Sequence, residues 1–387
     1  MASNEINKIS SVTMIGALPP LKGNAYYCMR LSSEIAESIE VNFISFKRLY
    51  PDFLYPGGVI DSDKQFQVKE RHNLKISRTI SYLNPVSWIR AAFLTSTSVV
   101  HLQWWSLPVA PVYLVILLSL KLKKKKIIFT VHNVVPHEKS PLDQWLTSMV
   151  LSFGNKFIVH TEDNREKLAK AFQIPEDRIS VIHMPVHDMY PATILSDEEI
   201  RIKYQLPPAG PVLLFFGNIR PYKGLDTLIK AMPEIIDVCP SAHLLVAGQS
   251  WGNWDKTYGQ IIRSLGLEDS VTAILDYVPM SEVANLFETS DLVVLPYIHF
   301  DAQSGVGNVA LAMKKPLVVT RVGGLEELVR EERALCPPGD VSGLAQTITR
   351  VLTDADLRIK LAMDSAYLGE LYSWSVAATK TIHVYEH

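Results

Sequence analysis

Short apolar runs alternate with segments of helical periodicity along the whole chain. In the first half, runs rich in β-branched and aromatic residues are expected to form strands at 12–18, 41–46, 98–104, 126–134, 156–161 and 179–184. Between them, apolar residues recur at helical spacing near 24–36, 142–152 and 165–172. Strands that alternate with helices predict a parallel sheet with helices on both faces. The first half is therefore expected to form one doubly wound lobe.

A polar, proline-containing stretch after His187 separates this series from a second one. An acidic helix is expected at 196–204, and further strands are expected at 212–217, 242–248, 271–278, 291–297, 316–320 and 334–338. The pattern predicts an α/β fold with two Rossmann-like lobes, 1–190 and 191–365, and a helix at 366–387 that packs back on the first lobe. Loops at the carboxyl ends of such strands bind ligands, so two facing lobes are expected to enclose a central cleft.

The bulk composition limits the partners and the compartment. The 387 residues include 38 basic and 40 acidic side chains, a net charge of −2, so no overall field favours nucleic acid as a partner. Three widely spaced cysteines give neither a disulfide framework nor a metal site. The first ten residues are polar and show no signal-peptide pattern, so a cytoplasmic location is expected.

One stretch raises the question of a membrane. The run 104–120 is almost uncharged, but Pro108 and Pro111 leave about ten uninterrupted apolar positions, short of the roughly 20 that span a bilayer. A buried helix between two strands is the expected structure. Five lysines follow this run: Lys121, Lys123, Lys124, Lys125 and Lys126. They suit peripheral association with an anionic membrane, at the inner face of the cell membrane, although a solvated helix end explains them too.

The segment 212–228 reads as an apolar strand, a glycine-ended turn and an amphipathic helix. The turn, GNIRPYKG, begins with Gly217 and Asn218 and carries Arg220 and Lys223. Such a turn directs cations and backbone N–H groups to a point beyond the strand, which suits a diphosphate. It has the glycine spacing of neither a P-loop nor a dinucleotide fingerprint. On this segment alone, solvated surface charges explain Arg220 and Lys223 equally well.

Other expected strand ends also carry polar residues or glycine. In the first lobe these are Gly16 and Gly23 after the first strand, and His132, Asn133, His137 and Glu138 in TVHNVVPHE. In the second lobe they are Tyr277, Val278 and Pro279 after one strand, and Asp301, Gln303, Ser304 and Gly305 before a helix. Helix amides after Ser304 can bind an anion, and Asp301 can accept hydrogen bonds from sugar hydroxyls. A plain helix cap and a structural histidine are the simpler explanations.

Taken in order, these pieces resemble a family. Four stretches are similar to the donor-binding lobe of retaining nucleotide-sugar glycosyltransferases of family 4 (glycosyl transferases group 1), which have the two-lobed GT-B fold. These stretches are GNIRPYKGLDTLIKA, LDYVPMSEVANLFETSDLVVLPY, QSGVGNVALAMKKPLVVTRVGG and CPPGDVSGLAQTI. The resemblance covers essentially the whole chain and is sharpest from Val212 to Gly339. It implies that the lobe 1–190 binds the acceptor and that the lobe 191–365 binds the donor.

The resemblance also assigns roles to the matching residues. Lys223 matches the lysine on the donor diphosphate, and Arg220 lies near the family's arginine, whose own position Asn218 occupies. Further matches are Tyr277 to Pro279 around the nucleobase, His132 beside the transferred sugar, and Gly23 near the diphosphate. Gly217 is also expected to bind the donor. The implied catalytic set is His132, Asp301, Arg220 and Lys223.

Two family positions differ in this chain. Asp301 and Val309 occupy the places of two glutamates, of which the first contacts sugar hydroxyls and the second the ribose. Asp301 keeps a carboxylate, whereas Val309 cannot accept a hydrogen bond. The run Gln303, Ser304, Gly305 and Val306 resembles a branch that replaces the usual Gly-Phe-Gly. The ribose end of the donor is therefore where this chain is expected to differ.

The reaction implied is transfer of a hexosyl group from a UDP- or GDP-sugar to a hydroxyl of a glycan or lipid-linked acceptor, in polysaccharide or glycoconjugate biosynthesis. Cations must lie where charge develops on the leaving phosphate, and Arg220 and Lys223 suit this role. No Asp-x-Asp pair or cluster of ligand spacing is present, so no metal cofactor is expected. An inverting reaction would need a base, for which His132, His137 or Glu138 are candidates. The acceptor-side candidates are Asn133, His137, Glu138, Trp104 and Trp105.

Two rival functions remain open. A non-catalytic GT-B subunit that binds a nucleotide sugar as a partner or scaffold is favoured by the missing second glutamate. A dinucleotide oxidoreductase would share the doubly wound lobes, but neither first strand-to-helix loop carries the Gly-x-Gly-x-x-Gly fingerprint.

Overall fold

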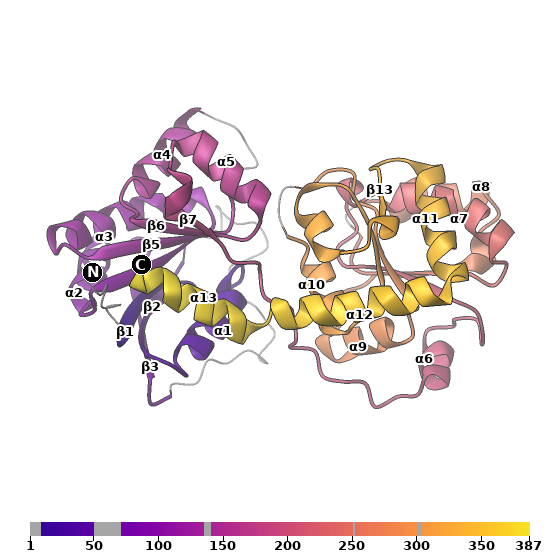
Figure 1. Ribbon diagram of the computed structural model, residues 1–387, viewed down its shortest axis with the longest axis horizontal. Helices are drawn as coiled ribbons and strands as arrows, with labels where there is room; N and C mark the ends of the chain where they lie inside the picture. Colours follow the sequence, from indigo (N-terminus) through magenta and orange to yellow (C-terminus); the bar gives the residue numbers. More distant parts are fainter. Residues whose placement is uncertain (1–8, 50–70, 135–140, 251, 301–302) are drawn as a thin grey trace, which may run out of the picture. The chain divides into compact units, whose positions relative to one another are not determined.

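A computed structural model describes residues 9–49, 71–134, 141–250, 252–300 and 303–387. The chain divides into two compact units (Figure 1). The N-terminal lobe comprises Met1–His183 and Trp374–His387, and the C-terminal lobe comprises Met184–Ser373. Each lobe has its own parallel sheet and its own apolar core.

The observed boundaries differ slightly from the predicted ones at 190 and 365. The segment after Met184 belongs to the C-terminal lobe because Val186 lies in that lobe's core and its N–H donates to Tyr372 O over 2.9 Å. The helix that contains residue 366 also stays in this lobe and continues to Leu371. The segment that joins the N-terminal lobe therefore begins at Trp374.

The N-terminal lobe contains a seven-stranded parallel sheet in the order β3-β2-β1-β4-β5-β6-β7. Its strands are β1 (Ser11–Gly16), β2 (Glu40–Arg48), β3 (Leu74–Ser81), β4 (Val99–Trp104), β5 (Lys126–Val131), β6 (Lys156–Val159) and β7 (Ile179–Val181). Successive residues of β1 point to opposite faces, as the pleat requires: Met14 joins the core on one face and Ile15 the core on the other. Both faces are therefore buried.

Helices cover both faces of this sheet (Figure 1). They are α1 (Ala25–Ile35), α2 (Pro85–Leu94), α3 (Ala110–Leu122), α4 (Pro141–Leu151), α5 (Glu162–Phe172) and α13 (Trp374–Glu386). Helices α1 and α13 pack against each other and share one core, which contains Tyr27, Leu31, Trp374 and Tyr385. Helices α2 to α5 contribute to the core on the other face.

Strand β3 and helix α2 were not predicted. The strand lies at the edge of the sheet, where only part of its surface is covered, and its sequence LKISRTIS carries exposed Lys75 and Arg78. Helix α2 buries only Ser87, Ala91 and Ala92. Both elements are formed by tertiary contacts that their polar or small buried residues do not signal.

The C-terminal lobe contains a six-stranded parallel sheet in the order β10-β9-β8-β11-β12-β13. Its strands are β8 (Val212–Phe216), β9 (His243–Ala247), β10 (Val271–Ile274), β11 (Leu292–Leu295), β12 (Leu317–Thr320) and β13 (Leu335–Cys336). Its helices are α6 (Asp197–Lys203), α7 (Leu225–Val238), α8 (Gln260–Ser264), α9 (Met280–Glu288), α10 (Gly305–Ala312), α11 (Val341–Thr353) and α12 (Ala355–Leu371). All six strands of this lobe were predicted.

Each sheet reverses its strand order at one point. In the N-terminal lobe β1 lies between β2 and β4, and in the C-terminal lobe β8 lies between β9 and β11. The crossovers on the two sides of such a strand go in opposite directions, which leaves a crevice at its carboxyl end. Ligand sites are therefore expected after β1 and β8.

The apolar run 104–120 forms the buried strand end, a short turn and helix α3. This helix buries Tyr113, Ile116 and Leu117 in the core, as the sequence predicted. Within the described ranges, no helix is both long enough and apolar enough to span a bilayer.

Candidate active site

A pocket of about 290 Å³ opens at the carboxyl ends of β8 and β11 in the C-terminal lobe. This is the crevice expected where the strand order reverses. Its lining residues are His187, Tyr190, Phe216, Gly217, Asn218, Tyr222, Lys223, Tyr297, Phe300, Ser304, Gly305, Val306 and Val309. Six of the residues predicted to bind the donor line it: Gly217, Asn218, Lys223, Ser304, Gly305 and Val306.

Lys223 supplies a buried cation to this pocket. Its side chain is 7% exposed, and its Nζ lies 5.6 Å from the centroid of the Tyr297 ring. Burial, reinforced by the nearby charge of Arg220, lowers the pKa of Lys223 from 10.5 to about 8. The ammonium group lacks much of its hydration, so an anion in the pocket would stabilise the charged form.

Glycine is required at both ends of the turn that positions Lys223. Gly217 has φ of 92°, and a Cβ there would lie 3.1 Å from both Lys223 Nζ and Val306 Cγ2. Gly224 has φ of 67°, and its Cβ would lie 1.9 Å from the carbonyl oxygen of Pro296. The backbone therefore approaches the lysine and β11 more closely than any other residue would allow.

The first turn of α10 forms another wall. Ser304 is its N-cap: its Oγ accepts from Gly307 N over 3.2 Å and lies 3.3 Å from Tyr297 Oη. A Cβ on Gly305 would lie 3.3 Å from His187 Cε1, so this glycine lets the helix approach the His187 ring. The N–H groups of a first helical turn and its dipole favour an anion at this end.

Gln303 has a different partner. Its Oε1 accepts from Met184 N over 2.6 Å, and its side chain is buried. It is not among the residues that line the pocket. Gln303 therefore fixes the segment that carries His187 and Tyr190 beside α10, and its predicted contact with the donor stays a prediction.

Several pocket residues were missed by the sequence analysis. Tyr222, Tyr297 and Phe300 form an aromatic wall, with Tyr222 and Phe300 stacked at a centroid distance of 6.1 Å. His187 lines the pocket, and burial lowers its pKa to about 4, so it is neutral near pH 7. The available signal was its position in IHMPVH, close to one other histidine, His183, and just before the polar stretch that separates the two series of strands.

The remaining second-lobe predictions lie around this pocket or outside the described residues. Tyr277 is exposed, and its proximity adds to burial in raising the pKa of Tyr190, a pocket residue, to about 12. Val278 and Pro279 follow it, and Pro279 directly precedes α9. Val309 lines the pocket with an apolar surface. Asp301 lies outside the described residues.

The N-terminal lobe holds a second feature, a cluster of histidines behind the carboxyl end of the sheet. His132, directly after β5, is half-buried; its Nε2 lies 2.9 Å from Gln103 Oε1 and its Nδ1 lies 3.1 Å from His160 Nε2. His160 Nδ1 lies 2.9 Å from the carbonyl oxygen of Ile182. Burial holds the pKa of His132 well below its usual value and lowers that of His160 to about 4.

The protonation of this cluster follows from its partners. The carbonyl of Ile182 only accepts, so His160 carries its proton on Nδ1, and its Nε2 accepts from His132 Nδ1–H. A neutral His132 then has an unprotonated Nε2 that needs a donor. The side-chain amide of Gln103 provides this donor when it is rotated by 180°, so that its NH₂ group takes the place of its oxygen. Both ring nitrogens of neutral His132 are therefore occupied within the lobe.

A further layer supports this cluster. His101 is fully buried, with Nε2 2.7 Å from Thr130 Oγ1 and 3.2 Å from the Gln103 amide, and its Nδ1 lies 2.7 Å from the hydroxyl of Tyr385 on α13. Burial lowers the pKa of His101 to about 3. His160 and Gln103 were not predicted, although His160 directly follows β6 just as His132 directly follows β5.

The acceptor-side predictions have mixed outcomes. Trp104 and Trp105 are buried in the core beside Tyr113, which removes the reason to place them at an acceptor or membrane surface. Asn133 is exposed, and its Nδ2 donates to Trp105 O over 2.7 Å, so it holds the loop after β5 in place. His137 and Glu138 lie outside the described residues. Gly23 has φ of 81° with open space around its Cβ position.

The five lysines after α3 have individual structural roles. Lys123, Lys125 and Lys126 donate to the carbonyl oxygens of Ala92, Thr97 and Tyr385 over 3.0, 2.7 and 2.9 Å. Lys121 lies over the Phe153 ring at 5.5 Å. These contacts hold the neighbouring segments in place and leave Lys121 and Lys124 as the exposed members.

Among the residues described, no group of three His, Cys, Asp or Glu side chains is arranged to hold a metal.

Comparison with known proteins identifies each lobe. Residues 210–354 match the family model described as glycosyl transferases group 1, and residues 23–188 match the model of glycosyltransferase family 4. A D-inositol 3-phosphate glycosyltransferase of Corynebacterium glutamicum is 29% identical over 236 residues, which are 59% of this chain and 56% of that protein. An uncharacterised glycosyltransferase of Methanocaldococcus jannaschii is also 29% identical, over 57% of each chain.

The chain thus spans little more than half the length of these relatives. Among solved structures, Anabaena HepE in complex with UDP and glucose has a TM-score of 0.69 at 15% identity, over 97% of this chain and 99% of that one. Its likeness shows the fold, two Rossmann-like lobes of the GT-B type. With a glycosyltransferase model matched on each lobe, the chain belongs to the glycosyltransferases of the GT-B fold.

Proposed function

We propose that this protein transfers a hexosyl group from a UDP- or GDP-sugar to a hydroxyl of a glycan or lipid-linked acceptor. The observation that carries the proposal is the pocket after β8, where the buried ammonium of Lys223 lies between Gly217 and the first turn of α10. A buried cation with a pKa of about 8 has no reason to be retained for stability alone. It suits the diphosphate of a nucleotide sugar.

The same groups suit the chemistry. As the bond to the anomeric carbon breaks, negative charge grows on the departing phosphate. Lys223, with Arg220 close enough to lower its pKa, provides fixed positive charge for that phosphate. A bound diphosphate would raise the pKa of Lys223, so the lysine stays protonated through the transfer. We therefore assign charge stabilisation to these two side chains and none to a metal ion.

The histidine cluster supports a retaining outcome. An inverting transfer needs a base that deprotonates the acceptor hydroxyl. Neutral His132 has both ring nitrogens engaged, by His160 and by the Gln103 amide, so it has none free for this task. We propose that the leaving phosphate itself takes the proton and that His132 presents its ring to the sugar from a fixed position.

The named relatives agree with these proposals without defining the substrates. HepE was solved with UDP and glucose, and the Corynebacterium relative is named for D-inositol 3-phosphate. The first supports a nucleotide-sugar donor, and the second supports a small phosphorylated hydroxyl compound as one kind of acceptor.

A thermal-shift screen of UDP, GDP and ADP sugars tests the donor site. A selectively bound donor raises the melting temperature by linkage, and Lys223→Ala is expected to abolish that rise. Lys230→Ala, at an exposed position on α7, is the matched control and keeps it. A donor-induced rise that is equal in all three proteins would remove Lys223 from the site.

A non-catalytic role is the second candidate, because Val309 lines the pocket where a ribose-binding glutamate was expected. Donor hydrolysis separates the two. Turnover that disappears in Lys223→Ala supports the enzyme. Preserved UDP binding without any turnover supports a scaffold, and activity that strictly requires NAD would overturn both.

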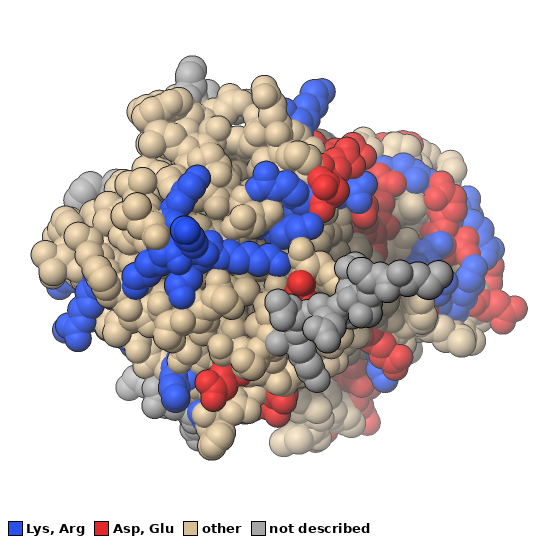
Figure 2. Space-filling view, turned by 60° about the vertical axis from the view of Figure 1, so that its left-hand side comes forward, with Lys and Arg blue, Asp and Glu red and all other residues tan. Residues whose placement is uncertain are grey.

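We also propose peripheral association with an anionic membrane through a ridge on the N-terminal lobe. Val86, Ile89 and Phe93 share one face of α2, and Leu118 and Leu122 share one face of α3. All five are exposed, Val86 by 73% and Leu122 by 86%, and α2 packs on α3. Lys and Arg side chains gather on this lobe in a largely uncharged surface (Figure 2). Apolar side chains flanked by cations suit the surface of an anionic bilayer.

Sedimentation with phosphatidylglycerol vesicles tests this ridge. Phe93→Ser combined with Leu122→Ser is expected to lower the bound fraction. Ile359→Ser removes an apolar side chain that is also exposed, but in the C-terminal lobe, and should leave it unchanged. Equal binding by all three proteins, or none by the wild type at low salt, contradicts the assignment.

A further inference from the structure

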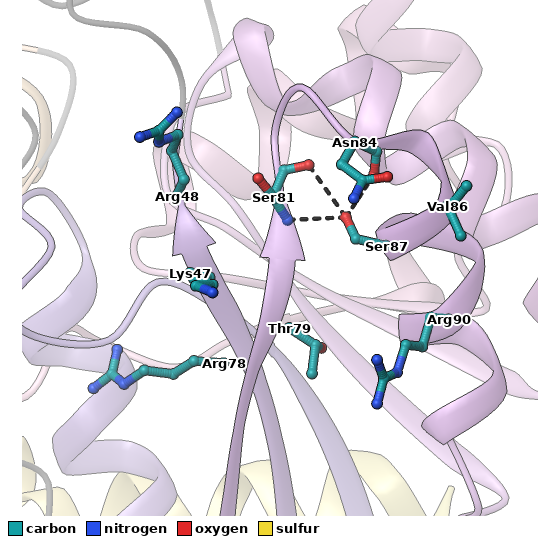
Figure 3. A pocket seen from close by; sticks show the side chains of 9 residues that line it. All are labelled: Lys47, Arg48, Arg78, Thr79, Ser81, Asn84, Val86, Ser87 and Arg90. Carbon is teal, nitrogen blue, oxygen red and sulfur yellow. Dashed lines mark hydrogen bonds between the residues drawn. The ribbon is translucent and has the colours of Figure 1, made fainter.

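A larger cavity lies in the N-terminal lobe, away from the histidine cluster. Its volume is about 640 Å³, and it opens at the carboxyl ends of β2 and β3 beside the first turn of α2 (Figure 3). Four cationic side chains line it: Lys47, Arg48, Arg78 and Arg90. No carboxylate is found among its described lining residues. The predicted donor motifs account for none of these residues.

The four charges are not neutralised within the described parts of the lobe. None of these side chains forms an ion pair with a carboxylate of any residue that the structure describes. Arg78 is held in place because its Nη2 donates to Pro19 O over 2.5 Å, which uses part of its five N–H groups and none of its charge. An anion bound in the cavity would be attracted by these positive side chains.

The uncharged part of the wall is rigid. Ser87 Oγ accepts from Ser81 N over 3.0 Å and donates to Asn84 O over 2.6 Å, which ties the first turn of α2 to the end of β3 (Figure 3). Trp88 Nε1 donates to Ser81 O over 2.8 Å and reinforces the same turn. The cavity is thus shaped before any ligand arrives.

One polar atom of the wall has no partner. Thr79 Oγ1 is buried and makes no hydrogen bond to any described residue. Buried hydroxyl groups without a partner are rare in proteins, and those in a cavity wall are commonly satisfied by what the cavity binds. Thr79 adds a neutral hydrogen-bonding group to the four cations, as is common where phosphate oxygens are recognised.

We propose that this cavity binds a phosphate ester carried by the acceptor. The inference rests on the proposed function and specifies its acceptor as a phosphorylated compound. Arginine favours phosphate because its planar fork of donors matches two phosphate oxygens at once. A carboxylate would bring one negative charge to four cations, whereas a phosphate or diphosphate brings two or more. Val86 belongs both to this cavity and to the apolar ridge, which suits a lipid-linked diphosphate. A soluble phosphate ester carries the same phosphate group and therefore has the required chemistry too.

Calorimetric titration with inorganic pyrophosphate tests the site, with UDP present to fill the donor pocket. Binding is expected to persist in Lys223→Ala and to weaken about tenfold or more in each of Arg48→Gln and Arg90→Gln. Lys75→Gln is the matched control, since Lys75 is exposed on β3 outside the cavity, and it should bind as the wild type does. UDP binding should be unchanged in the two arginine variants.

The possible outcomes separate this inference from the donor assignment. Pyrophosphate binding that is lost in Lys223→Ala, or equal in the arginine variants and the wild type, overturns the acceptor site. Failure of both UDP and GDP to bind while pyrophosphate still requires Arg48 and Arg90 refutes the donor pocket and supports the cavity. Sedimentation with phosphatidylcholine vesicles that carry a polyprenyl diphosphate identifies the source. Release of the protein by pyrophosphate indicates a lipid-linked acceptor, and pyrophosphate binding without sedimentation indicates a soluble one.

Discussion

Replacing Lys223 with methionine is expected to stabilise the protein while removing donor binding. Methionine keeps an unbranched side chain of similar length but carries no charge. The lysine is 7% exposed, and its pKa falls from 10.5 to about 8. One pKa unit corresponds to about 1.4 kcal/mol, so the buried charge costs about 3 kcal/mol of folding free energy. For a lobe of this size, that gain would raise its melting temperature by roughly 6–12 °C.

The stability difference between the Lys223→Met variant and the wild type depends on pH. Below pH 8 the lysine is protonated in both the folded and the unfolded chain, so the full cost is present. Between pH 8 and 10.5 the folded chain loses the proton first, and the wild type becomes more stable as the pH rises. Above pH 10.5 neither form is charged, and the advantage of the variant disappears. UDP affinity of the wild type should also fall above pH 8, because the diphosphate binds the protonated lysine.

Urea unfolding at pH 7 and at pH 10.5, followed by circular dichroism, measures the difference, and titration with UDP measures binding. Lys230→Met is the control, because Lys230 is 48% exposed on α7 and its replacement should change stability by less than about 0.5 kcal/mol. A Lys223→Met protein that is no more stable than the wild type at pH 7, or whose advantage is equal at both pH values, would refute the reasoning.

Three further predictions concern other parts of the molecule. Gln103→Glu places a carboxylate beside His132 and should raise the pKa of that histidine, seen by NMR titration of its ring; a wild-type His132 that titrates near pH 6.5 contradicts the neutral cluster. Asn308 is fully buried, and its amide has no partner among the described residues. Asn308→Leu keeps the branched shape and should stabilise the protein by about 1–3 kcal/mol in urea unfolding, whereas destabilisation would show that the amide is hydrogen-bonded. Gly224→Ala should destabilise it by about 2–4 kcal/mol and weaken UDP binding, because the new Cβ meets Pro296 O; unchanged stability would be inconsistent with the positive φ.

The sequence predicted the C-terminal lobe well because its central strands β8, β9, β11 and β12 are buried on both faces. Runs such as VLLFF and HLLVA are continuously apolar, and glycine marks their ends. The turn with Lys223 was recognised for the same reason, since its residues are adjacent in the chain. Edge strand β3 and helix α2 escaped detection because few of their apolar residues are buried.

The sites formed by distant residues could not be predicted. The cavity of the N-terminal lobe combines Arg48 at the end of β2 with Arg90 on α2, and neither residue is distinguished within its own segment. His132 was selected from its position after a strand, but its partner His160 follows 28 residues later and becomes visible only when β5 and β6 pair. Trp104 and Trp105 were named as acceptor-side candidates, but both are buried in the core, which their sequence positions alone did not reveal.

The hydrogen bond between His101 and Tyr385 joins residues that are 284 positions apart. The whole C-terminal lobe is synthesised between them, because α13 follows it in the chain and then completes the N-terminal lobe. During translation, the face of the N-terminal sheet that α13 covers therefore stays uncovered until the second lobe has left the ribosome. The order of synthesis thus makes the support of the histidine cluster one of the last parts of the molecule to form.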